Sequence, residues 1–331
     1  MKEKNKGFTL VELLAVIVIL ALIALIATPI ILNVINDAKK QAAKDSAYGY
    51  MDAVEKYIVS SELEDKSIKD GTYSVEELNS MGVSVKGSTP DNGNIEIKNS
   101  SVKSYDIGID GYAVSNGEVK KVSTTKKFEN GTAVYYNPET ETKCKSSEAV
   151  STTGTKRGCM KWYVFNDKEG NATVNVILDH NTTAGVAYNS TGSNSEMKEV
   201  KKALENDTKD WKNTARLITA NEVAKITGYT SWGTNITGYP WFYFDSNNQT
   251  QIANSTNKSK YAWLFDYTNE CTNYGCNVSD SSNWGYWTSI PYKDNSTYAW
   301  HVYRVGSLYN YYVFDKAIGV RPVITISKSN I

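Results

Sequence analysis

The stretch that decides the fold of this chain runs from Gly7-Phe-Thr-Leu-Val-Glu12 into Leu13–Asn36, a segment that contains no charged residue. At about 1.5 Å per residue, a helix over this segment is roughly 36 Å long, enough to cross a hydrocarbon core of about 30 Å. Three lysines among the first six residues precede it and mark the cytoplasmic side of a membrane. The sequence therefore predicts one membrane-spanning helix at the N-terminus.

Glu12 is the carboxylate at the N-terminal edge of this apolar segment, where an ionised group is costly unless it finds a partner. Taken alone, such a glutamate is also compatible with a side chain that extends to the lipid headgroups. An ordinary secretory signal would be cut after its apolar core. Ala27-Thr28-Pro29 is a poor cleavage sequence, however, and the helical pattern continues beyond it through Ile35 and Ala38.

Gly7–Glu12, followed by the uncharged segment, resembles the cleavage and methylation signature of type IV prepilins. The resemblance implies that a membrane peptidase cuts after Gly7 and methylates the new amine of Phe8. It also implies that Glu12 pairs with this amine on a neighbouring subunit during assembly. Pro29 fits the same pattern, because a proline inside a helix removes a backbone hydrogen bond and allows a kink.

The patterns divide the chain into five parts and predict an α+β fold. They are a leader peptide at 1–7, a pilin-type helix at 8–61 with its transmembrane part at about 8–36, a small β head at 62–122, a linker at 123–128, and an α+β domain at 129–331. The β head is an antiparallel sheet backed by the second half of the helix.

Local motifs support the β head. Ser74 and Glu77 form a capping box that starts a short helix, and Asn116-Gly117 lies between two alternating runs as in a tight hairpin. Asp106 and Asp110 could belong to a metal loop, but the alternation of a strand explains them more simply.

The last two hundred residues hold all eight tryptophans. We expect helices at about Glu196–Trp211 and after Thr219, whose capping box includes Glu222. Alternating or apolar runs predict strands, namely Thr173–Leu178, Ala299–Tyr303, Tyr311–Phe314 and Val323–Ile326.

Trp284–Ser289, Trp300, Gly306 and Gly319–Val323 resemble the C-type-lectin-like fold, in the form found in formylglycine-generating and related bacterial surface domains. The resemblance implies a fold and not an activity, because the calcium- and sugar-binding motifs of true lectins and the cysteine chemistry of the oxidase are absent. It is compatible with Arg321 as a buried, hydrogen-bonded structural residue.

The four cysteines fall into two near pairs, Cys144 with Cys159 and Cys271 with Cys276. Neither pair has the spacing of a zinc knuckle, and the chain has only two histidines to complete a metal site. We favour two disulfides over free thiols, which places most of the chain outside the cytoplasm. We find no candidate catalytic residue and expect no metal and no cofactor, so the chain is predicted not to be an enzyme.

These patterns favour a minor type IV pilin-like subunit, which is anchored in the bacterial cell membrane by one span before assembly and then lies in a surface filament. Its expected partners are other pilin subunits, the prepilin peptidase and the membrane. The alternatives are a pseudopilin-like component of a type II secretion or competence machine, and a surface enzyme on a pilin stalk. Basic and acidic side chains both number 36, so nucleic acid is not an expected partner unless the chain serves in competence.

The loop-rich region at about 229–287 carries five tryptophans among small polar residues, a mixture typical of binding surfaces. Trp232 and Trp241, flanked by glycine and proline, are the predicted contacts to a glycan or protein ligand. Because acidic calcium motifs are missing, we expect this binding to be independent of metal.

Overall fold

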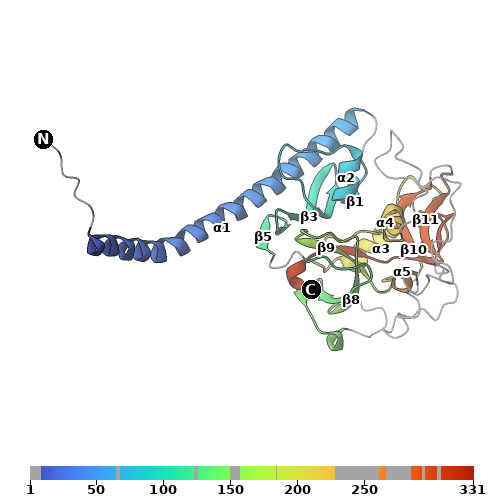
Figure 1. Ribbon diagram of the computed structural model, residues 1–331. Coiled ribbons are helices and arrows are strands. Elements are labelled where there is room, and N and C mark those ends of the chain that lie inside the picture. The colour runs from blue at the N-terminus through green and yellow to red at the C-terminus, as the bar shows by residue number, and fades with distance from the viewer. Residues whose placement is uncertain are drawn as a thin grey trace.

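The structure, a computed structural model, describes residues 9–64, 68–122, 126–149, 157–183, 185–227, 261–265, 285–292, 295–303 and 307–331. Figure 1 shows one long helix, α1 (Leu10–Leu63), whose second half lies against a body formed by the rest of the chain. The observed end of α1 lies two residues beyond the predicted one.

α1 is helical over 54 residues although it contains Pro29. The absent N–H of Pro29, together with a 2.6 Å hydrogen bond from the Thr28 hydroxyl to the Ala24 carbonyl, weakens the helix ladder at this point. Figure 1 shows that α1 changes direction within its first half. The second half buries an apolar stripe at helical spacing, which includes Ala43, Ala47, Tyr50, Val54 and Ile58.

A five-stranded antiparallel sheet, which we call the head sheet, packs on this stripe. Its strands lie in sequence order, and they are β1 (Gly71–Ser74), β2 (Asn92–Lys98), β3 (Ser101–Ile109), β4 (Tyr112–Ser115) and β5 (Glu118–Lys121). The predicted capping box is confirmed, since Ser74 and Glu77 exchange hydrogen bonds at the start of α2 (Val75–Met81). Asn116 and Gly117 have φ angles of 45° and 85°, which the predicted tight hairpin requires.

The C-terminal domain, residues 126–331, is built on two sheets and three α-helices in its described part. One sheet has the order β14-β9-β8-β6-β7, formed by β6 (Ala133–Asn137), β7 (Thr142–Lys143), β8 (Met160–Phe165), β9 (Thr173–Leu178) and β14 (Val323–Ser327). The other has the order β12-β11-β10-β13, formed by β10 (Gly285–Pro291), β11 (Tyr298–Tyr303), β12 (Ser307–Tyr312) and β13 (Ile318–Gly319). The helices are α3 (Lys198–Thr208), α4 (Ala220–Thr227) and α5 (Ala262–Phe265). This arrangement confirms the predicted α+β class.

Two predicted boundaries in this domain are wrong. The helix expected at Glu196–Trp211 is shorter, because the Trp211 N–H turns to the Thr208 carbonyl. The strand expected at Tyr311–Phe314 instead ends at Tyr312, where a turn closes from the Asp315 N–H to the Tyr312 carbonyl. Local turns close both ends, and the apolar pattern used for the prediction does not reveal them.

A disulfide joins Cys144, just after β7, to Cys159, just before β8. The predicted pairing is therefore present, and its Cα atoms lie 6.1 Å apart. Closing a loop of this length contributes about 3 kcal/mol in the chain-entropy account. The second predicted pair, Cys271 and Cys276, lies outside the described residues.

Polar side chains couple the head sheet to the C-terminal domain along an interface that we call the seam. Arg216 is buried there and donates to both oxygens of Glu222, at 2.7 and 2.5 Å. Its Nε donates to Asn94 of β2 at 2.6 Å. Asn94 in turn donates to the Thr214 carbonyl, and the Thr214 N–H donates to Asp106 at 2.6 Å. Asn94 and Asp106 of the head sheet thus find their partners in the opposite layer.

The seam changes the interpretation of Asp106. Strand alternation explained this residue from sequence, and it does lie on β3, but the face that it occupies is covered by the C-terminal domain and not by water. The predicted linker at 123–128 therefore joins two parts that also share a buried, hydrogen-bonded interface.

Burial raises the pKa of two carboxyl groups in or beside the seam. The pKa of Glu77 rises to about 7, because burial and the Glu222 charge outweigh the attraction of Arg216. The pKa of Asp106 rises to about 6, since burial outweighs its hydrogen bonds to Ser115 and Thr214. Both groups bind their protons more tightly in the folded chain than in the unfolded one.

Stability should therefore fall as the pH rises. A carboxyl group whose pKa is raised on folding stabilises the folded chain fully at pH values below its unfolded pKa, which is about 4.3 for Glu. This stabilisation is lost as the pH rises through the folded pKa. Urea denaturation measures this change. Between pH 5 and pH 8.5 the free energy of unfolding of the wild-type chain should fall relative to that of Glu77→Gln, which keeps the cap but cannot ionise. Glu118→Gln on β5 is the control. If the free energies of unfolding of wild-type and Glu77→Gln differ by the same amount at both pH values, the raised pKa of Glu77 is contradicted.

Candidate functional site

The first half of α1 presents apolar side chains to solvent. From Leu10 to Ile35 the side chains are exposed, apart from Ala27, which is half-buried. By length and composition this helix could span a membrane, and none of its most apolar window is buried within the subunit. A continuous apolar surface of this size requires lipid or other helices to cover it.

Glu12 caps the start of this helix. Its carboxylate accepts the Thr9 N–H and the Thr9 hydroxyl, both at 2.8 Å, and the Glu12 N–H donates back to the Thr9 hydroxyl oxygen. These bonds hold a negative charge at the first turn, where the helix dipole favours it. The carboxylate therefore lies exposed at the N-terminal end of the apolar helix. Gly7 and Phe8 themselves lie outside the described residues.

Sequence reasoning missed this cap. Thr9 and Glu12 have the spacing of a capping box, the same signal that located the starts of the helices after Ser74 and Thr219. The capping box of Thr9 and Glu12 therefore stabilises the first turn of α1, in addition to any role of these residues in processing.

Most of the described tryptophans belong to the core. Trp162, Trp287 and Trp300 are fully buried, and Trp263 packs against the ring of Tyr163. Trp287 was among the five tryptophans of the predicted aromatic binding region, and it is instead covered within β10. The predicted contacts Trp232 and Trp241 lie outside the described residues.

Aromatic rings that are exposed or half-buried occur elsewhere, around the edge strand β12 of the second sheet. Tyr292, Tyr298, Tyr312 and Phe314, which we call the aromatic cluster, follow one another with ring centroids 6.1, 4.5 and 5.2 Å apart. Tyr312 is 41% and Phe314 51% exposed. Figure 1 places β10 and β11, beside this cluster, on the side of the body away from the first half of α1. The alternating pattern of a strand could not reveal these exposed rings, because it does not show which strand lies at the edge of the sheet.

The buried arginine of the lectin-like resemblance behaves as expected. Arg321 is fully buried and donates to the carbonyls of Leu178, Trp263 and Leu264, with its guanidinium over the Tyr286 ring. It therefore ties β9 and α5 to the last strands.

Neither histidine lies in a cluster suited to metal. Within the described ranges no three His, Cys, Asp or Glu side chains are grouped to hold an ion. His180 contacts Asp179, its neighbour in sequence, and burial lowers the pKa of His301 to about 3, so that its ring is neutral.

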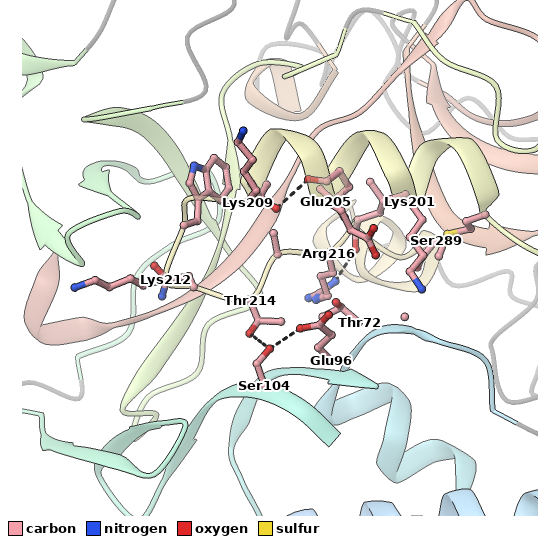
Figure 2. Close-up of a pocket in the computed structure, with 18 residues that line it drawn as sticks. Thr72, Glu96, Ser104, Lys201, Glu205, Lys209, Lys212, Thr214, Arg216 and Ser289 are labelled. Atoms are coloured by element: carbon pink, nitrogen blue, oxygen red, sulfur yellow. Dashed lines mark hydrogen bonds between the residues drawn. The ribbon is translucent and has the colours of Figure 1, made fainter. Parts of the chain in front are cut away.

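A cavity of about 350 Å³ opens at the seam. Figure 2 shows its walls, where Lys201 and Glu205 of α3 reach toward Thr72 and Glu96 of the head sheet. Lys209 and Lys212 point away from this group.

Comparison with known proteins gives one match, at the N-terminus. Residues 2–28 match the family model described as the prokaryotic N-terminal methylation motif. No curated protein and no solved structure matches the chain. The lectin-like fold of the C-terminal domain stays a prediction. The matched motif and the long apolar helix that contains it make the chain similar to type IV pilins and pseudopilins at its N-terminus.

Proposed function

We propose that this chain is a minor subunit of an extracellular type IV pilus-like filament and that it displays the C-terminal domain on the cell surface. The observation that carries the proposal is the first half of α1, which combines the methylation motif, an uncovered apolar surface and a capped carboxylate. Lipid would cover this surface before assembly, and the helices of other subunits would cover it afterwards.

In this proposal the prepilin peptidase cuts after Gly7 and methylates the amine of Phe8, which stays cationic. Glu12 of one subunit and the Phe8 amine of the next then neutralise each other within the filament. An unpaired charge in that apolar setting would be costly, so pairing favours one register between subunits.

The display role is supported by two features of the body. The buried polar bonds of the seam hold the C-terminal domain at a fixed orientation on the head sheet. The aromatic cluster lies away from the membrane-spanning part of the chain, and tyrosine rings suit recognition of a glycan or a protein surface. We propose that this role is binding without metal and without catalysis, which favours an adhesive subunit over a pseudopilin with no ligand of its own.

Replacing Glu12 tests the assembly step. Glu12→Ala removes the cap and the charge, whereas Glu12→Gln keeps a capping side chain and removes only the charge. Both variants should insert into the membrane normally and be depleted from sheared filaments by about 100-fold or more, since loss of one partner of a buried ion pair costs about 3–5 kcal/mol. Immunoblots of membrane and filament fractions measure this. Normal incorporation of Glu12→Gln would show that the charge is not needed.

Replacing the aromatic cluster tests the display step. Filaments that carry Tyr312→Ser and Phe314→Ser together should lose binding on glycan and extracellular-matrix arrays, while Tyr48→Ser, which removes an exposed ring from α1, should not. Binding by wild-type filaments should persist in a chelator. Loss of binding with chelator would refute the metal-free claim, and full binding by the double variant would exclude the cluster as the contact surface.

A further inference from the structure

A groove follows the edge strand β1 along the seam. The cavity of about 350 Å³ adjoins a smaller one of about 60 Å³. Both are lined by Gly71 and Thr72 of β1 on one side and by Met197, Lys201 and Ser289 on the other. Because β1 is the outermost strand of the head sheet, the groove runs beside a strand that has a neighbour on one side only.

The main chain of Thr72 faces this groove. Ser74 directs its N–H to the Glu77 carboxylate at 2.7 Å and not to β2. Alternate residues of a strand direct their N–H and C=O groups to the same side, so Thr72 directs its own pair away from β2 as well. Among the described residues no hydrogen bond to this pair comes from across the groove. An edge with free donors and acceptors is a template for another strand.

Two acidic side chains line the larger cavity, one from the head sheet and one from α3. Glu96 extends from β2 and accepts a hydrogen bond from Ser104, and Glu205 extends from α3. Neither carboxylate forms an ion pair in the described part of the chain, and Lys201 is the one lysine that Figure 2 shows reaching the same space. Arg216 does not neutralise them, because Glu222 already holds its guanidinium. Met197, Leu204 and Trp211 supply an apolar wall.

The geometry points to a peptide-binding groove: an extended segment of a partner polypeptide adds to β1 through the main chain of Thr72 and places a lysine or arginine side chain between Glu96 and Glu205. Main-chain bonds supply affinity in this mode, and the pocket for one side chain supplies specificity. The long stem of the basic residue would lie on the apolar wall, with its charged end at the two carboxylates. This site is separate from the aromatic cluster and does not depend on filament assembly.

The test uses the full chain in detergent micelles and a library of acetylated, amidated hexapeptides, with lysine fixed at each position in turn. Fluorescence polarisation of the best lysine peptide is compared with that of its Lys→Glu form and of forms methylated at single backbone nitrogens. We expect the Lys→Glu peptide to bind at least about tenfold more weakly, and methylation at one alternate set of nitrogens to weaken binding about fivefold, as loss of one hydrogen bond does.

Variants of the protein locate the site. Glu205→Gln should weaken the lysine peptide about tenfold, and Glu205→Lys should reverse the preference toward the Lys→Glu peptide. Lys212→Gln is the matched control, because Lys212 lines the same cavity but points away, and it should leave binding unchanged.

Three results would overturn the proposal. They are the absence of any library peptide with a dissociation constant below about 1 mM, equal binding of the Lys and Glu peptides, and an equal effect of Glu205→Gln and Lys212→Gln. None of them would affect filament incorporation, so the failure of this site is distinguishable from the failure of the proposed function.

Discussion

The structure depends on one constraint: the first half of α1 is apolar on every face, and the described part of its own subunit buries none of its most apolar window. Water cannot be its permanent surroundings, because exposing so many leucine and isoleucine side chains is unfavourable by about 25 cal/mol for each Å². The helix must therefore lie in lipid or among other helices. Glu12 restricts how the helix can pack among other helices, because a carboxylate at the start of an apolar helix is stable only beside a hydrogen-bond donor or a cation. Thr9 supplies the donors within one subunit, and a neighbouring amine would supply the charge.

The second half of α1 differs from the first, because the head sheet buries its apolar stripe. The other face of that sheet packs against the C-terminal domain. A sheet covered on both faces by unlike partners explains why β2 and β3 bear polar residues that are nevertheless buried. Arg216, Asn94 and Asp106 fix the orientation of the two layers through directional bonds, which apolar contacts alone would not do. The raised pKa values of Glu77 and Asp106 are the electrostatic cost of that arrangement. They also make the seam sensitive to pH near neutrality.

Much of this could be predicted from the sequence wherever the controlling interaction is local. The helix, its proline, the capping boxes at Ser74 and Thr219 and the Asn116-Gly117 hairpin all follow from residues a few positions apart. The cap at Thr9 obeys the same rule and was overlooked. The seam could not be predicted, because the bond between Thr214 and Asp106 joins residues 108 positions apart and the period of a strand does not show what covers each face. The exposure of Tyr312 and Phe314 was hidden for the same reason, since it depends on the order of strands in the sheet.

Filament assembly as proposed requires a cleavage that leaves α1 attached and frees the amine of Phe8. Peptide mass spectrometry of protein sheared from the cell surface measures this directly. The account predicts a mature N-terminus at Phe8 with a methylated amine, because only that cut removes the basic leader and keeps the apolar helix. A mature chain that begins after Ala27, or a filament fraction that contains the uncut chain, would contradict it.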